Sequence, residues 1–317
     1  MTGTRVATRG SAVEPSRWTT WRLSAIVVVC AGLVACFVVA ARWFLASSTG
    51  ADFLASYPGH SRLPAGTPGD APWWVELQHA FNFLFIILLI RSGWLVHRQA
   101  RPEAYWTRNN TGRFTTRRPP GKMSLYLWLH LSMDVLWVLN GVVFVVLLFV
   151  TGNWRRIVPV HWDIVPNAVS AGLQYLSFDW PVNTPWVSYN ALQVIAYGVT
   201  VLIAGPLAAV TGIRLSPVWR SEWRISKIYP IEVARAIHLP VMIYFSVFIV
   251  AHVALVLSTG AGENLNFMYA NQPPGSTSWW GPAVFSVTML VVIAAWIAAR
   301  PFFMQGIARL TGKVTTR

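Results

Sequence analysis

The sequence predicts an all-α fold, an integral membrane bundle of six transmembrane helices. Of the 317 residues, 55% are hydrophobic and 11% are charged. Six apolar stretches exceed about 18 residues, the length at which a helix can cross a bilayer core. They lack the alternation of barrel strands, and lipid leaves helices as the other way to pair every backbone group. The expected helices cover residues 24–45, 75–95, 126–150, 189–211, 236–258 and 282–300.

The chain begins with a basic segment, residues 1–23, that we expect to be cytoplasmic. Residues 24–73 would hold an additional first helix and an outer loop rich in Gly and Pro. The apolar part of this helix is longer than that of a signal peptide, so it is predicted to be an anchor. Its cysteines, Cys30 and Cys36, suit neither a disulfide framework nor a zinc site.

Positive charge is distributed according to the expected topology. The net charge is +14, and 20 of the 25 Lys and Arg residues fall in the N-terminal segment, the second and fourth interhelical loops and the C-terminal tail. The positive-inside rule then places both termini in the cytoplasm of a multi-pass plasma-membrane protein. The basicity follows from topology, so no nucleic-acid partner is expected.

Local signals mark helix ends and one bend. Three Thr-Gly dipeptides, at 151–152, 211–212 and 259–260, are predicted to end helices, since Gly supplies the left-handed cap residue. Pro206 is a candidate for a kink in the helix 189–211.

Four of the seven histidines lie in the first or last turns of apolar helices, where ionisable groups usually have a definite task. They are His79, His130, His238 and His252. The last two are fourteen residues apart, so on a helix they are separated by roughly 21 Å and face within about 40° of each other.

Depth along the helices pairs these histidines. Relative to the helix midpoints, His79 and His252 lie about 9 Å and about 7 Å toward the outside. His130 and His238 lie about 12 Å and about 13 Å toward the cytoplasm. Spacing and topology therefore predict two stacked pairs, His79 with His252 and His130 with His238.

Two imidazoles at one level of a bundle suit the two axial positions of a haem iron. Arg235, one turn before His238, would meet the inner propionates. Zinc would need further ligands, and no carboxylate or cysteine stands at the right depth. The alternative for each histidine is a hydrogen-bonded residue in helix packing.

Three further residues bear on this interpretation. His97 shares the face of His79 but lies beside Arg98 at the inner helix end, where an interfacial role is favoured over ligation. Gly93 and Gly141 follow His79 and His130 on their helix faces and would make room for the opposite haem, although Gly also serves close helix packing.

The pattern resembles the di-haem b-type cytochrome subunits of membrane-bound formate dehydrogenases, nickel–iron hydrogenases and thiosulfate reductases. The resemblance covers residues 74–260, a four-helix core, and leaves 261–317 as a C-terminal transmembrane helix and basic tail. Its most specific element is the helix "RAIH…H…STG", with two histidines fourteen apart. The resemblance implies two b-type haems, with one histidine from each of the first two core helices.

A second match is "NALQVIAY" at the start of the helix 189–211. In the family this region borders a quinone site beside a haem, so Asn190 and Gln193 would contact menaquinone or ubiquinone. Asn190 would equally serve as a helix N-cap. The additional first helix inverts the core relative to formate dehydrogenase, which puts the quinone near the outer haem. A partner, expected to be a molybdopterin oxidoreductase, would dock at the basic cytoplasmic face.

The sequence thus predicts a respiratory electron-transfer subunit rather than a complete enzyme. Asp134, one turn after His130, would handle protons, orient that histidine, or form a structural hydrogen bond. The alternatives are a proton-coupled transporter with histidine relays, and an anchor without a cofactor. A transporter would be expected to show repeats and matching helix breaks, and an anchor has no need of depth-matched histidines.

Overall fold

The computed structural model describes residues 17–69, 72–98, 101–111, 115–116, 119–180 and 189–316, and it is 71% helical. Residues 1–16 of the expected basic N-terminus lie outside this description. All six predicted transmembrane helices are present, each long and apolar enough to cross a membrane. They are α1 (Arg17–Ala46), α3 (Trp73–Arg98), α4 (Leu125–Val150), α6 with α7 (Ala191–Val199 and Gly205–Leu215), α9 (Ile231–Ser258) and α11 (Trp280–Ala298).

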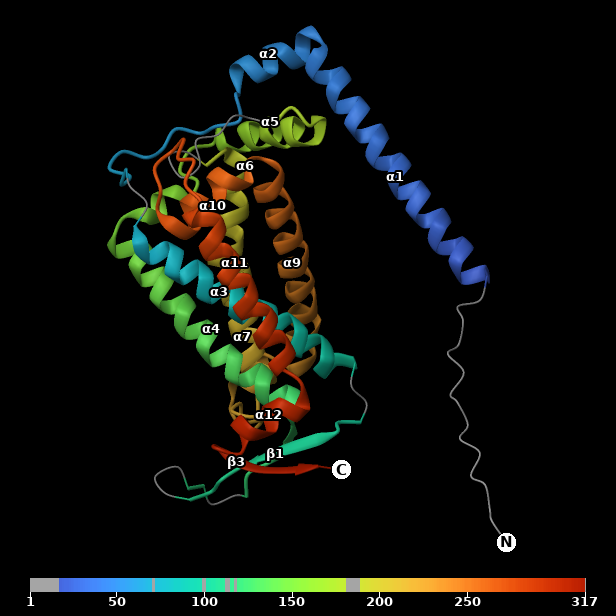
Figure 1. Cartoon of the computed structure of the whole chain (residues 1–317), viewed down its shortest axis with the longest axis vertical. Helices are drawn as coiled ribbons and strands as arrows, with labels where there is room; N and C mark the ends of the chain where they lie inside the picture. The colour runs from blue at the N-terminus through green and yellow to red at the C-terminus, as the bar shows by residue number, and fades with distance from the viewer. Residues whose placement is uncertain are drawn as a thin grey trace.

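Five of these helices form the bundle, and α1 stands apart from it (Figure 1). Within the bundle α3 packs along α4, and α7 packs along α9. The main contacts of α1 are to α2 (Ser48–Ser56) and α5 (Ile164–Ser177) near its C-terminal end, where Arg42 Nε donates to the Ser177 carbonyl at 2.8 Å. Most of the apolar side chains of α1 are exposed, as expected for a helix that faces lipid on all sides.

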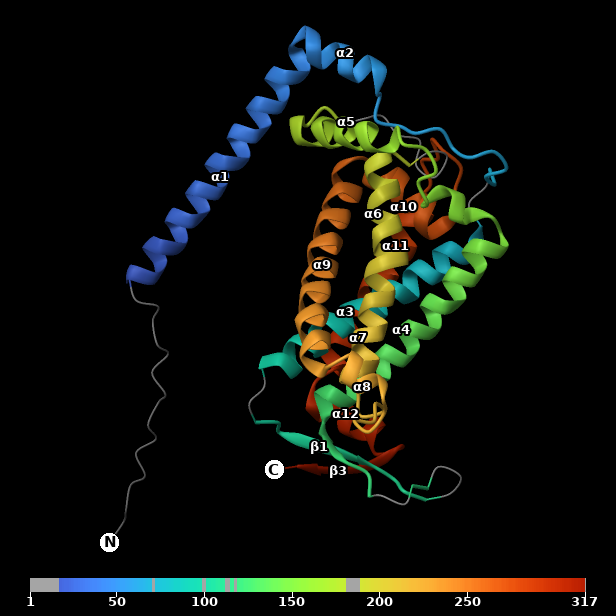
Figure 2. The same cartoon turned by 180° about the vertical axis from the view of Figure 1, so that it is seen from behind.

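The two ends of the bundle differ (Figure 2). At one end, called the α5 end here, α5 lies across the helix termini beside α2, α10 (Ala261–Ala270) and the 3-10 turn η2 (Asn153–Arg156). At the other, called the sheet end, lie a small β-sheet, α8 (Ile225–Ile228) and α12 (Pro301–Ala308). The helix α5 was not among the expected elements.

The sheet is a second element that the sequence did not predict. Strands β1 (Ala104–Arg108), β2 (Lys122–Ser124) and β3 (Gly312–Thr316) pair antiparallel in the order β2-β1-β3. On β1, the buried Trp106 donates from Nε1 to the Ala308 carbonyl at 3.0 Å. The sheet thus fastens the C-terminal tail, predicted only as a basic segment, to the loop after α3.

Local chemistry explains the helix ends. Ser124 caps α4 by accepting from the Leu127 N–H. Gly152 and Gly260 follow α4 and α9 with φ of 75° and 128°, so two of the three predicted Thr-Gly ends are confirmed. The third prediction was wrong, because Gly212 lies inside α7, which continues to Leu215.

The helix that carries Pro206 is irregular, as Pro206 suggested. A π-helical segment, η3 (Thr200–Ala204), joins α6 to α7, and the Gly205 N–H bonds back to the Thr200 carbonyl. Proline has no N–H to continue the α-helical pattern, so the widened turn accommodates it. The Thr200 hydroxyl also lies 2.7 Å from the Tyr244 hydroxyl on α9, which ties the irregular turn to that helix.

Candidate functional site

The structure brings the four intramembrane histidines together in two pairs. His79 on α3 faces His252 on α9, with ring centroids 6.2 Å apart and planes at 63°. His130 on α4 faces His238 on α9, with centroids 6.3 Å apart and planes at 82°. The first pair lies toward the α5 end and the second toward the sheet end, which is the arrangement that helix depth predicts.

The spacing within each pair fits one metal ion between the rings. Metal–nitrogen bonds to imidazole are about 2.0 Å, and a nitrogen lies about 1.15 Å from its ring centre, so two opposed ligands would place the centroids about 6.3 Å apart. Both observed separations agree with this value within about 0.1 Å. Two facing imidazoles of this kind would hold the iron of a b-type haem.

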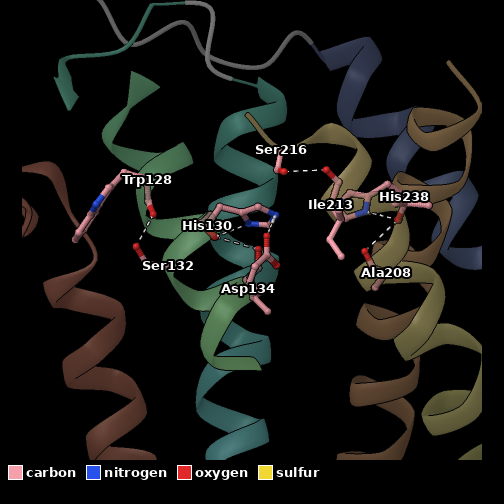
Figure 3. A network of polar contacts seen from close by, with 11 residues as sticks. Trp128, His130, Ser132, Asp134, Ala208, Ile213, Ser216 and His238 are labelled. Atoms are coloured by element: carbon pink, nitrogen blue, oxygen red, sulfur yellow. Dashed lines mark hydrogen bonds and ion pairs between the residues drawn. The ribbon is translucent and has the colours of Figure 1, made fainter. Parts of the chain in front are cut away.

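The imidazoles at the sheet end are held from behind by hydroxyl groups. Ser92 Oγ on α3 lies 2.9 Å from His130 Nδ1, and Thr211 Oγ1 on α7 lies 2.7 Å from His238 Nδ1. Asp134 Oδ2 is 3.7 Å from His130 Nε2, the other nitrogen of the ring (Figure 3). Of the two contacts to the His130 imidazole, the one from Ser92 has hydrogen-bond length.

The imidazoles at the α5 end have aromatic neighbours instead. Phe248 stacks on His252 with centroids 5.7 Å apart and planes 4° from parallel. Tyr269 meets the edge of His79 at 5.9 Å. His79 Nδ1 is buried and has no hydrogen-bond partner among the described residues.

A cavity of about 650 Å³ opens beside the α5-end pair. Its lining is mostly apolar, and His79 and His252 both reach it. Polar groups gather toward the α5 end of the cavity, among them Gln193 and the buried Arg156, whose Nη2 bonds the carbonyls of Pro68 and Gly69. Burial lowers the pKa of the Arg156 guanidinium, an environment that favours an anionic neighbour. The volume and lining suit an apolar cofactor with acidic groups at one edge.

Residues 70–270, a segment that includes all four histidines, match the family of prokaryotic cytochrome b561. The chain belongs to this family. It is a multi-pass membrane protein of a family that binds haem b, and its activity is consistent with electron transfer. No curated protein and no solved structure was found to match the chain. The family match favours the haem interpretation over the transporter alternative.

Glycines leave space around the rings of this cytochrome b561 family member. A Cβ on Gly93 would lie 3.1 Å from His130 Cε1, closer than ordinary contact, and one on Gly212 would lie 3.6 Å from His238 Cε1. Gly141 lines the α5-end cavity, and a Cβ there would meet nothing within 4 Å. The positions predicted for Gly93 and Gly141, each near the opposite pair, agree with the structure.

The structure assigns Asn190 to helix capping. Its side chain accepts from the Gln193 N–H while Gln193 Oε1 accepts from the Asn190 N–H, so the N-cap alternative is confirmed, in the form of a capping box. Asn190 Nδ2 also donates to the Tyr175 hydroxyl at 2.8 Å. Both ends of the amide are thus engaged, and Gln193 is the member of the pair that lines the cavity.

Two other predicted residues lie at the sheet end. Arg235 is exposed, one turn before His238 on α9. His97 is also exposed and packs near Trp94 with centroids 6.2 Å apart, which agrees with the interfacial role. Sequence reasoning missed Ser92 and Thr211. A signal was present for Thr211, which precedes Gly212 in a dipeptide that was interpreted only as a cap.

Proposed function

We propose that the chain is the di-haem cytochrome b subunit of a membrane oxidoreductase and carries electrons between the quinone pool and a redox partner. The supporting observation is the presence of two histidine pairs with the same ligand spacing, 6.2 and 6.3 Å, at opposite ends of one bundle. Helix α9 supplies one histidine to each pair, so one helix sets the distance between the two sites. An electron could then cross the bilayer in two stages.

Each group of residues has a defined task in this proposal. When bound, haem b supplies an iron that exchanges one electron. His79 with His252, and His130 with His238, would hold the two irons, while the apolar lining would exclude water. Arg156 at the α5 end and Arg235 at the sheet end would face the propionates.

The orientation follows from charge. Three of the four segments that hold the 20 inner Lys and Arg residues lie at the sheet end: the loop after α3, the loop between α7 and α9, and the C-terminal tail. The sheet end would therefore be cytoplasmic, with both termini inside. This basic face would dock the partner, for which a molybdopterin-dependent oxidoreductase is our choice from the family resemblance.

Quinone would react near the haem at the α5 end. Gln193 borders the cavity there, and its side chain lies one turn from Tyr197, which meets His252 edge-on at 6.1 Å. A role for Asn190 in quinone binding would require its release from the cap and from Tyr175. The quinone is menaquinone or ubiquinone, both of which present two carbonyl acceptors on an apolar ring.

Quinol-driven reduction of the haems tests the proposal. The protein in lipid nanodiscs would be mixed anaerobically with a menaquinol or ubiquinol analogue, and the reduced haem band followed in time. His238→Ala should keep rapid reduction of the remaining α5-end haem. His252→Ala should lose quinol-driven reduction while dithionite still reduces its sheet-end haem. Equal rates of quinol reduction in the two variants would contradict a quinone site at the α5 end.

A further inference from the structure

The hydroxyl of Thr211 determines which ring nitrogen of His238 carries the hydrogen. Thr211 Oγ1 lies 2.6 Å from the Leu207 carbonyl and 3.1 Å from the Ala208 carbonyl. A carbonyl oxygen only accepts, so the single hydroxyl hydrogen points toward the helix backbone. The contact of 2.7 Å to His238 Nδ1 must then run the other way, with Nδ1–H donating to Oγ1. The free lone pair of the ring is consequently on Nε2.

Ser92 makes the equivalent contact to His130. Its Oγ donates to the Leu89 carbonyl at 3.2 Å and lies 2.9 Å from His130 Nδ1. With the Ser92 hydrogen directed to the Leu89 carbonyl, the His130 ring donates from Nδ1 to the Ser92 oxygen, as His238 does to Thr211. Ser92 and Thr211 are fully buried or nearly so, at 0% and 1% exposed, which keeps water from competing for these bonds.

The α5-end pair is built differently. His79 Nδ1 has no hydrogen-bond partner among the described residues, and the ring of His252 is stacked on Phe248. An imidazole that donates from Nδ1 to an acceptor becomes a more basic ligand through Nε2. A more basic axial ligand stabilises the ferric form and so lowers the midpoint potential.

We propose that Ser92 and Thr211 are positioning residues that hold His130 and His238 with Nε2 toward the metal and give the sheet-end haem a lower midpoint potential than the α5-end haem. This inference rests on the proposed di-haem function. This difference in midpoint potential favours electron transfer from the sheet-end haem to the α5-end haem. The proposal also makes the hydroxyls, and not Asp134, the groups behind the ligands.

Potentiometric titration of the haem spectrum tests the proposal, with Thr211→Val as the main variant. Valine keeps the shape of threonine but removes the acceptor. Loss of a bond behind a ligand commonly changes metal affinity by 10-fold or more, and a tenfold relative loss for the ferric form is a rise of about 59 mV for one electron. Ser92→Ala should shift the same haem in the same direction. The midpoint potential of the α5-end haem should not change.

Two matched variants separate the hydrogen bond from packing. Thr211→Ser keeps the hydroxyl and should titrate as the wild type. Ser132→Ala removes a hydroxyl on α4 whose one hydrogen bond to the described residues is to the Trp128 carbonyl of its own helix, and it should also leave both potentials unchanged (Figure 3). A shift in Thr211→Ser equal to that in Thr211→Val would overturn the proposal, as would an unshifted Thr211→Val that retains both haems.

The wild-type potentials give a test that does not depend on these variants. His252→Ala and His238→Ala leave the sheet-end and α5-end haem respectively, which assigns each potential to its site. The proposal fails if the sheet-end haem has the higher potential. A wild-type chain that binds fewer than two haems is a different result, because it overturns the proposed function before any potential is compared.

Discussion

Gly93→Ala should weaken the haem site at the sheet end selectively. The added Cβ would lie 3.1 Å from His130 Cε1, 3.6 Å from its Nδ1 and 3.7 Å from Met242 Sδ. The His130 ring cannot retreat freely, since Ser92 holds it from behind at 2.9 Å. Overpacking of this kind costs about 1–3 kcal/mol, which corresponds to a loss of haem affinity of roughly 5- to 150-fold.

Gly212→Ala is the matched control. It places a methyl group beside the other ring of the same pair, His238, but at 3.6 Å, an ordinary contact. Both substitutions lie in helices and gain up to about 1 kcal/mol of helix propensity, so this gain cancels between them. Haemin would be titrated into both apoproteins and each site followed by its reduced-minus-oxidised spectrum. Equal affinity in the two variants would refute the reasoning from contact distance.

Three other substitutions test separate parts of the structure. Gly141→Leu projects a side chain into the α5-end cavity and should reduce the occupancy of the α5-end haem below half. Full occupancy of this haem would contradict the assignment of the cavity. Asn190→Ala removes the cap and the bond to Tyr175, so thermal unfolding should reveal a loss of about 1–2 kcal/mol, whereas an unchanged Tm would show that the cap is dispensable. Asn266→Ala leaves the buried Gly281 N–H without its acceptor, so proteolysis of the segment between α10 and α11 should become faster. A cleavage rate equal to that of the wild type would contradict this prediction.

The number of helices and the pairing of the histidines could be predicted from the sequence because each depends only on distance along a helix. Apolar length defines a membrane span, and residue count along a helix gives depth. His79 and His252 therefore paired correctly although 173 positions separate them. No knowledge of which helices are neighbours was needed.

Which side chains contact the outer nitrogens of the histidines depends on how the helices pack side by side. The depth of a residue along its helix does not determine this packing. Ser92 and Thr211 approach the rings from α3 and α7, and Ser or Thr in a membrane helix commonly bonds only its own backbone. Orienting His130 is one of three roles predicted for Asp134, which lies one turn away, and its carboxylate lies 3.7 Å from Nε2 while Ser92 contacts Nδ1 at 2.9 Å. Gly212 was interpreted as a cap, but the α-helix continues past it and its hydrogen atom faces His238.

The α5 helix and the sheet were missed for a different reason. Both lie in segments that join or follow the transmembrane helices, where no regular element was predicted, and both pack through tertiary contacts. The sheet joins β1 to β3, which are about 200 residues apart in sequence, so no local sequence pattern predicts this pairing.

The central claim is that this chain binds two haems, one between each histidine pair. Its most direct test is a dithionite-reduced minus air-oxidised spectrum, with haem quantified per chain, for the wild type, His252→Ala and His238→Ala. We expect two b-type haems in the wild type and one in each variant, with the remaining haem differing between them. A single haem in the wild type, or two haems retained in either variant, would contradict the claim.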